Sequence, residues 1–178
     1  MRRADGRDVQ PTAAIVDSQS VKTTEAGGPR GYDMGKKIQG RKRHLLVDTM
    51  GLILAVTVLP ANIQDRDGAK VVLRSLRDRF CWVKRVWADG AYAGQLVEWV
   101  AGLRRRRPVE LEIVKRSEPA EGFQVQPHRW IVERTLGWLN RSRRLSKDYE
   151  ATTDSSVAMI KLAMIHVMVR RIAPASVF

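Results

Sequence analysis

Two aspartates end short apolar stretches of this chain. Asp17 ends the stretch AAIVD, and Asp89 ends VWAD just before Gly90. Polar or glycine-containing segments bound both stretches, which predicts short buried strands over 12–18 and 83–89. If these strands are neighbours in one sheet, both carboxylates leave it at the same edge, where α/β folds usually place their sites. A strand-end aspartate is also a common turn residue, so neither motif decides the question by itself.

A third acid, Glu133, lies in the segment RWIVERTLGWLNRSRRL, which has the pattern of an amphipathic helix. At about 100° per residue, the chain gathers its cations on one face and its apolar side chains on the other. The cationic face carries Arg129, Glu133, Gly137, Asn140 and Arg144. The opposite face carries Ile131, Thr135, Trp138, Leu139, Ser142 and Leu145. A carboxylate held among cations suits a group that binds a metal beside a polyanion; the alternative is an exposed glutamate on a basic helix.

Three such carboxylates can form a site for divalent cations. Mg²⁺ prefers oxygen ligands and keeps several waters, so Asp17, Asp89 and Glu133 can hold one or two such ions, with Mn²⁺ as a possible substitute. Two ions about 3.5–4 Å apart can activate a nucleophilic oxygen and stabilise a leaving 3′ oxygen in phosphodiester displacement. The histidines show no metal-ligand spacing, and this mechanism needs none.

The charge of the chain favours a polyanionic partner. Its 178 residues fit one domain with a real hydrophobic core, and 32 Lys and Arg against 19 Asp and Glu leave a formal charge of +13. Nucleic acid is the commonest partner of so basic a protein. A ribosomal or histone-like binder would share this charge, so charge does not separate an enzyme from a binding module.

The apolar segments and the single cysteine indicate a cytoplasmic protein without a membrane span. Cys81 alone excludes an intrachain disulfide and a CxxC metal site, and no secretory segment opens the chain. The longest mostly apolar run, at 157–169, is broken by Lys161 and His166. It is shorter than the roughly 20 residues that cross a bilayer, so we expect a packed helix.

The order of the predicted elements gives the fold class. After the first strand, a glycine-rich loop leads to the hairpin RHLLVD and LILAVTVL, joined by a turn at Asp48. A helix from PANIQD to about Phe80, the strand at 83–89, a helix over 92–106 and the strand VELEIVKR follow, and a polar connection over 116–127 leads to the Glu133 helix and a last helix over 153–171. This order predicts an α/β fold: a mixed sheet with flanking helices, whose first three strands form an antiparallel meander.

Several linked segments resemble the bacterial insertion-sequence DDE transposases of family five. They are AAIVDSQSVKT, GKKIQGRKRHLLVDTMGLILAV, PANIQDRDGA, WADGAY and RWIVERTLGWLNRSRRL, and they occur in that family's order over nearly the whole chain. The resemblance implies a ribonuclease H-like fold in which Asp17, Asp89 and Glu133 are the catalytic, metal-binding triad. It also implies DNA as the partner, both the ends of an insertion sequence and a target, with the protein acting as a homo-oligomer on that DNA.

The chain departs from this family in two respects. The broader family carries Tyr, two residues, Arg, three residues, Glu, six residues and Lys; Arg129 and Glu133 match, whereas Gln126 and Asn140 take the Tyr and Lys positions. We expect Arg141 and Arg144 to supply the missing positive charge. Family five proteins also begin with a helical DNA-binding region ahead of the catalytic domain. The chain resembles a second reading frame or a truncated copy, in which case a separate region would carry that DNA-binding function. On that view 1–11 is a linker or truncated N-terminal region, and 12–173 is the catalytic domain.

A basic run beside the first hairpin is a second candidate DNA contact. It comprises Lys36, Lys37, Arg41, Lys42 and Arg43, for which a solvated charge run and contact with phosphates are about equally favoured. Arg129 would orient Glu133 or a phosphate. Asp48 is interpreted as a turn residue, and Asp65 and Asp67 as residues that open a helix.

These observations predict a Mg²⁺-dependent DNA transposase of the cut-and-paste type, which cleaves and transfers DNA strands. Two alternatives remain open. One is a ribonuclease H-like nuclease that cleaves without joining strands, and the other is a catalytically inactive basic DNA-binding protein.

Overall fold

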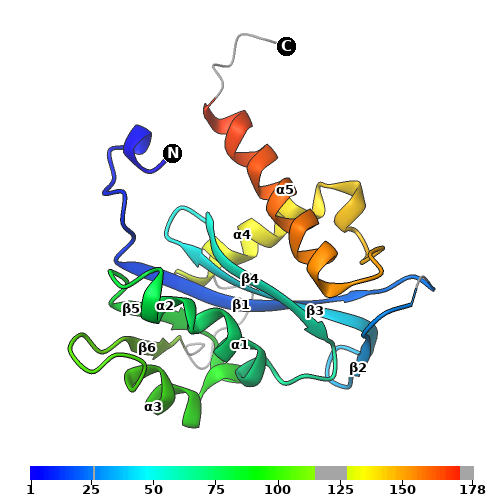
Figure 1. The fold of residues 1–178 in the computed structure, drawn as a ribbon, viewed down its shortest axis with the longest axis horizontal. Coiled ribbons are helices and arrows are strands. Elements are labelled where there is room, and N and C mark those ends of the chain that lie inside the picture. Colours follow the sequence, from blue (N-terminus) through cyan, green and yellow to red (C-terminus); the bar gives the residue numbers. More distant parts are fainter. Residues whose placement is uncertain (26, 115–127, 173–178) are drawn as a thin grey trace, which may run out of the picture.

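The computed structural model describes residues 1–25, 27–114 and 128–172, and in these residues six strands form one sheet flanked by helices (Figure 1). The strands are β1 (Ala13–Lys22), β2 (Gly31–Asp33), β3 (Ile38–Asp48), β4 (Ile53–Pro60), β5 (Arg85–Ala88) and β6 (Glu110–Ile113). The α-helices are α1 (Asp65–Leu73), α2 (Ser75–Asp78), α3 (Gln95–Ala101), α4 (Arg129–Asn140) and α5 (Thr153–Ile172). Short 3-10 helices cover η1 (Arg3–Asp5), η2 (Gly90–Tyr92) and η3 (Arg143–Leu145).

The long strand β1 lies in the middle of the sheet. It pairs antiparallel with β3 and parallel with β5, and β5 pairs parallel with β6. On its other side β3 pairs antiparallel with β4 and, at its start, with β2. The predicted α/β, ribonuclease H-like mixed sheet with flanking helices is therefore confirmed, together with the antiparallel meander of β1, β3 and β4.

The β3–β4 hairpin is closed by Asp48. Its buried carboxylate accepts hydrogen bonds from the backbone N–H groups of Met50 (2.9 Å) and Leu52 (2.8 Å), and it accepts one from Arg2 (2.5 Å). Gly51 adopts a φ of +82°, which a residue with a side chain rarely does. Asp48 is thus a turn residue, as the sequence predicted.

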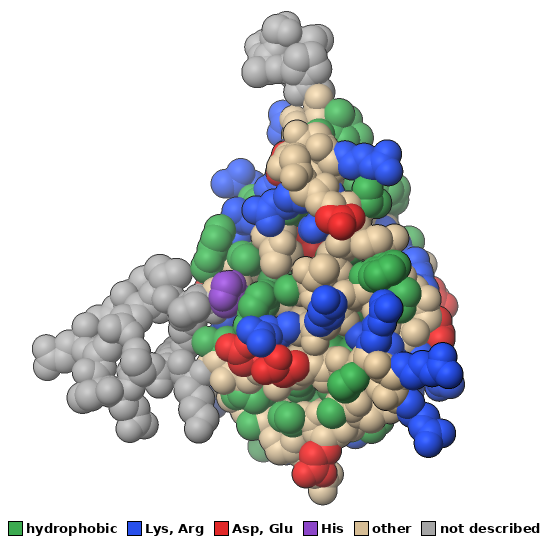
Figure 2. Space-filling view, turned by 90° about the vertical axis from the view of Figure 1, so that its left-hand side faces the viewer, with side chains coloured by type: hydrophobic (Ala, Val, Ile, Leu, Met, Phe, Trp, Pro, Cys, Tyr) green, Lys and Arg blue, Asp and Glu red, His purple; other side chains and the backbone are tan. Residues whose placement is uncertain are grey.

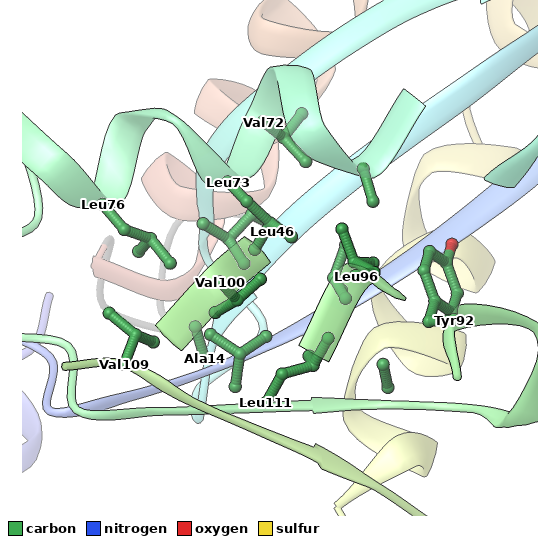
Figure 3. Packing of buried hydrophobic residues seen from close by; sticks show 14 of the residues in the cluster. Ala14, Leu46, Val72, Leu73, Leu76, Tyr92, Leu96, Val100, Val109 and Leu111 are labelled. Carbon is green, nitrogen blue, oxygen red and sulfur yellow. The ribbon is translucent and has the colours of Figure 1, made fainter. Parts of the chain in front are cut away.

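The sheet separates two hydrophobic layers. On one face Ala14 and Val16 pack with α1, α2 and α3, and Figure 3 shows the buried side chains of this layer meeting. On the other face Ile15 packs with side chains of α4 and α5. Because neighbouring side chains of a strand point to opposite faces, the residues that follow in β1, Asp17 and Ser18, are directed to the α4 side and the α1 side respectively.

Several predicted boundaries need correction. The first strand does not end at Asp17 but continues to Lys22, because the polar residues after Asp17 keep pairing with β3. The strand predicted over 43–48 already begins at Ile38, so Arg41 and Lys42 also belong to it. Gly31–Asp33, predicted as part of a loop, forms the short strand β2. The single helix predicted up to Phe80 is divided into α1 and α2, and that predicted over 92–106 is confined to α3. The polar connection at 116–127 lies outside the described residues. Of the described helices, none is long and apolar enough to cross a membrane.

Candidate active site

The three predicted acids come from three different elements. Asp17 is in β1, Asp89 directly follows β5, and Glu133 is in α4. In the parallel pair β1–β5, Ile15 lies opposite Trp87. Asp17 and Asp89 each come two residues later, so the alternation of side chains directs both to the face that α4 covers. The register of two strands therefore brings together acids that are 72 positions apart in the sequence.

The three carboxylates surround one guanidinium nitrogen. Nη2 of Arg129 lies 3.8 Å from an oxygen of Asp17, 3.4 Å from one of Asp89 and 3.6 Å from one of Glu133. Because all three oxygens lie within 3.8 Å of the same nitrogen, no two of them are more than twice 3.8 Å apart. Arg129 is one helical turn before Glu133 on α4, which places both side chains on the same face. The structure thus brings together the three acids and Arg129.

Exposure increases from the first acid to the third. The side chain of Asp17 is 15% exposed, that of Asp89 29% and that of Glu133 52%. Burial raises the pKa of Asp17 to about 6, and the charge of Asp89 adds to this rise, against a backbone hydrogen bond from Ser18 and the charges of Arg129 and Lys36. Asp89 accepts a hydrogen bond from the backbone N–H of Ala91 (2.9 Å), which fixes the carboxylate at the start of η2.

An aromatic pair positions the start of α4 against β5. The rings of Trp87 and His128 are stacked with their centroids 4.0 Å apart, and the Trp87 indole donates a hydrogen bond to Glu112 on β6. His128 directly precedes α4 and has a φ of +65°. Because Arg129 is the next residue, this stacking fixes where the guanidinium enters the group of acids.

The donors suit a hard divalent cation. All three are carboxylates, the ligands that Mg²⁺ and Mn²⁺ prefer, and three of them together require positive charge, which Arg129 supplies here. In the part of the chain that the structure describes, no group of three or more His, Cys, Asp or Glu side chains is spaced so as to hold a metal ion as it stands. The three acids therefore suit a divalent cation by their chemistry and accessibility, whereas their spacing in this structure, with the Arg129 guanidinium among them, is not that of a metal site.

Comparison with known proteins shows the family of the chain. The family model described as "Transposase DDE domain" matches residues 9–168. The chain belongs to the transposase DDE domain family. It is also similar to a protein of Burkholderia cepacia described as a putative transposase for insertion sequence element IS402, with 32% identity over 155 residues, 83% of this chain and 70% of that protein. The predicted membership of the insertion-sequence DDE transposases is confirmed.

A second polar cluster, which the sequence did not predict, lies on the opposite face of β1. The Lys42 ammonium lies 3.0 Å from an oxygen of Asp65 and 3.4 Å from one of Asp33, and it donates a hydrogen bond to the carbonyl of Ile63 (2.9 Å). Ser18 donates a hydrogen bond to Asp65 (2.7 Å) and so connects this cluster to β1. Asp65 lies in the first turn of α1 as predicted, but it also has this second role.

Hydrogen bonds keep Asp33 charged in this cluster. Burial alone would raise its pKa, but hydrogen bonds from the Ser20 hydroxyl and the Lys36 N–H, together with the charge of Lys42, lower the pKa of Asp33 to about 2. Tyr92, from the WADGAY segment, is buried near Asp17, Asp65 and Asp89, and this burial raises the pKa of its hydroxyl well above the usual value.

The structure corrects the predicted role of the basic run on β3. Arg41, Lys42 and Arg43 are buried, so their side chains are not available to DNA phosphates. Arg41 pairs with Asp148 at 3.0 Å and donates to several backbone carbonyls, and Arg43 donates to the carbonyl of Leu145 (2.9 Å). The prediction that these three residues contact DNA is therefore wrong, because their side chains form ion pairs and hydrogen bonds inside the protein.

The other predicted DNA contacts are accessible, although not all lie where the helical pattern placed them. Lys36 and Lys37 are exposed in the turn before β3, and the Lys36 ammonium lies 3.4 Å from the carbonyl of Ser18. Arg141 is exposed at the end of α4. Arg144 lies in η3 rather than on α4, where it pairs with Glu150 at 2.9 Å. Gln126, one of the two departures from the family pattern, lies outside the described residues.

Lys and Arg side chains are spread widely over the protein surface. On the face that Figure 2 shows they are scattered across the molecule, while acidic side chains gather in a few places beside them. In the whole chain Lys and Arg outnumber Asp and Glu, which gives the formal charge of +13. It provides non-specific attraction to a polyanion but does not by itself locate a binding path.

Proposed function

We propose that this domain cleaves DNA and transfers DNA strands at the site formed by Asp17, Asp89 and Glu133. The observation that carries the proposal is the convergence of these three acids, from three separate elements, around the Arg129 guanidinium at distances of 3.4–3.8 Å. Family membership makes DNA the expected substrate, and the formal charge of +13 suits it.

Each residue of the site has a proposed part in this reaction. Asp17, Asp89 and Glu133 would hold Mg²⁺, or Mn²⁺, which when bound activates a nucleophilic oxygen and stabilises the leaving 3′ oxygen. Arg129 orients Glu133 and holds negative charge at the site, whether that of the acids or of a phosphate. Lys36 adds positive charge on the β1 side. The attack of water on phosphorus breaks the bond to the 3′ oxygen, so that a 3′-hydroxyl and a 5′-phosphate are left. In strand transfer that 3′-hydroxyl attacks a second phosphodiester, and the bond from this phosphorus to its own 3′ oxygen breaks, so that a new 3′-hydroxyl leaves on the attacked strand.

The wider arrangement follows from the same proposal. Residues 12–173 form the catalytic domain, and 1–11 are a linker that precedes it. The partners are the ends of an insertion sequence and its target, on which the protein acts as a homo-oligomer in the bacterial cytoplasm. Lys36, Lys37, Arg129, Arg141 and Arg144 are the proposed DNA contacts.

A nicking assay on supercoiled DNA, with Mg²⁺ or with a chelator, tests the proposal. We expect Mg²⁺-dependent nicking by the unaltered chain, and a loss of more than about 100-fold in Glu133→Gln and Asp89→Asn, because electrostatic groups at a reacting centre contribute at least this much. The matched controls Glu98→Gln and Asp154→Asn change exposed acids on α3 and α5 and should nick normally.

Three outcomes would change the assignment. Normal nicking by Glu133→Gln would remove that residue from the site. Nicking without joining of the 3′ end to a target, under conditions where a control transposase joins, would favour the nuclease. DNA binding with no metal-dependent nicking would favour an inactive DNA-binding protein.

A further inference from the structure

A groove that lies away from the three acids is lined by cations. Its volume is about 700 Å³, and it lies where the end of β1, the start of β2 and the segment after η3 meet, at the right-hand end of β1 in Figure 1. The lining residues are Lys22, Thr23, Thr24, Glu25, Arg30, Gln39 and Lys147. Three cations against one acid, together with two threonine hydroxyls, give it the chemistry of a phosphate-binding surface.

The cations of this groove differ from the buried cations of the same sheet. Lys22, Arg30 and Lys147 are exposed, and within the described residues none of them has an acidic oxygen within 4.0 Å. By contrast, Arg41 and Lys42 are buried in ion pairs. Charges that are not neutralised inside the protein remain available to an external anion.

The backbone of the groove is held firmly. Lys22 and Thr24 are bonded to Asp148 through the hydrogen bonds Asp148 N–H to Lys22 O (2.8 Å) and Thr24 N–H to Asp148 O (3.2 Å). Lys147 directly precedes Asp148, whose carboxylate is fixed by Arg41. Lys22 and Lys147 therefore come from distant parts of the sequence but stand on backbone that is bonded together.

The position of the groove relates it to the acids. The backbone of Lys22 lies five residues beyond that of Asp17 along β1, which at about 3.3 Å per residue corresponds to roughly 16 Å. The alternation of side chains directs Lys22 to the opposite face of the sheet from Asp17. Lys147 also lines a small cavity with Arg43 and Met159, so it is the groove cation on the side of α4 and α5. Successive phosphates of one DNA strand are about 3.4 Å apart along the duplex axis, so the backbone distance from Asp17 to Lys22 corresponds to about five base pairs. The exposed Lys36, near the carbonyl of Ser18, lies beside the stretch of β1 between the two places.

We propose that this groove binds the sugar–phosphate backbone of DNA about five base pairs from the phosphate that lies at the three acids. The inference rests on the proposed function for its substrate, and it adds a binding surface that holds the DNA in register with the site. Its size is that of a pocket for a whole small ligand, which leaves room for a segment of backbone rather than a single anion.

Salt-dependent DNA binding, measured with a random duplex and without Mg²⁺, tests the groove independently of cleavage. Each phosphate contact contributes about 0.9 to the slope of log affinity against log salt concentration. The triple variant Lys22→Ala, Arg30→Ala, Lys147→Ala should therefore lower that slope by about 2 to 3. The control Arg74→Ala, Arg77→Ala, Lys84→Ala removes the same charge from exposed positions in or next to α1, α2 and β5, and should leave the slope nearly unchanged.

Cross-linking adds a measurement of position. Cys81 is the single cysteine of the chain and is exposed, so Cys81→Ser with Lys147→Cys gives one site for a photoactivatable label. On nicked DNA we expect cross-links centred about five base pairs from the nick, and none above background from a label at Arg77→Cys. Cross-links spread evenly along the duplex would overturn the proposal.

The outcomes separate this inference from the proposed function. A groove variant with the slope of the unaltered chain overturns the groove, even if cleavage depends on the three acids. A lowered slope with correctly placed cross-links supports the groove, even if no cleavage is detected. Absence of DNA binding by the unaltered chain overturns both.

Discussion

Two clusters built around a cation lie back to back across β1. On the α4 side, Arg129 is surrounded by three acids whose side chains become progressively more exposed. On the α1 side, Lys42 lies between Asp33 and Asp65, and the Lys42 and Asp33 side chains are at most 10% exposed. Asp17 belongs to the first cluster and its neighbour Ser18 to the second.

The difference between the clusters lies in access to water and in the balance of charge. The buried cluster matches each charge with a partner or a backbone group, as a dry interior requires. The accessible cluster has three acids for one guanidinium, and water can hydrate the excess negative charge. Similar residue types therefore serve stability on one face of the strand and provide negative charge for an external cation on the other.

The largest expected effect is the loss of the buried cation. Lys42→Met leaves Asp33 and Asp65 without their partner in the interior, so we expect the free energy of unfolding to fall by about 3–5 kcal/mol. Arg129→Met removes a cation from acids that water reaches, and should cost less than about 1 kcal/mol. Urea denaturation of both variants measures the contrast, and equal losses would contradict the distinction drawn here.

Two buried titrating groups, one on each face, should oppose one another as the pH changes. Burial lowers the pKa of His44 to about 4, with Asp65 opposing and Lys42 and Lys36 assisting this shift. Between pH 6.5 and 4 the unfolded chain therefore binds the extra proton, and stability falls as the pH falls. Asp17, with its pKa raised to about 6, has the opposite effect between pH 6 and 4, because the folded chain then binds the extra proton.

Single variants should reveal these opposed effects, each about 3 kcal/mol in size. The His44→Leu variant should become more stable as the pH is lowered from 6.5 to 4.5, and the Asp17→Asn variant should become less stable. Denaturation curves across this range, without divalent metal, provide the measurement. Parallel pH profiles for the two variants would show that the shifts are misassigned.

The smallest expected effects come from two helical glycines. A Cβ at Gly68 on α1 would lie 2.1 Å from the buried ring of His44, so Gly68→Ala should cost about 1–3 kcal/mol through overpacking. A Cβ at Gly137 on α4 meets nothing within 4 Å, so Gly137→Ala should stabilise by up to about 1 kcal/mol through helix propensity. Thermal unfolding compares them, and destabilisation by both would argue against the open α4 surface.

The order of most elements was predictable because it rests on local patterns, whereas the grouping of the acids came from the family resemblance. Apolar stretches predicted every strand of the sheet except the short β2, and the 3.6-residue period placed Ile131, Thr135 and Leu139 on one side of a helix, where all three are buried. The same period failed for Arg144, since Ser142 has an extended backbone that ends the helical path. The spacing of apolar residues predicts which side chains share one face of a helix, but it does not show at which residue the helix ends.

The buried polar side chains were not predictable from local patterns. Arg41 and Arg43 belong to a run of cations, which usually lies in solvent. Their burial depends on groups about a hundred positions away, such as Asp148 and the carbonyl of Leu145. Only the fold brings these partners to β3, so the sequence pattern alone indicated the wrong environment.

The contacts of Arg41 have a consequence for how the protein opens. Its guanidinium donates hydrogen bonds to the carboxylate of Asp148 and the carbonyls of Glu150 and Ala151, in the segment that leads into α5, and to the hydroxyl of Ser156 in the first turn of α5. If that segment detached, the Arg41 guanidinium would stay buried without its partners, which is unfavourable in free energy. The amides at the start of α5 should therefore exchange with solvent only when β3 itself comes apart, so that the last helix and the central strands behave as one cooperative unit.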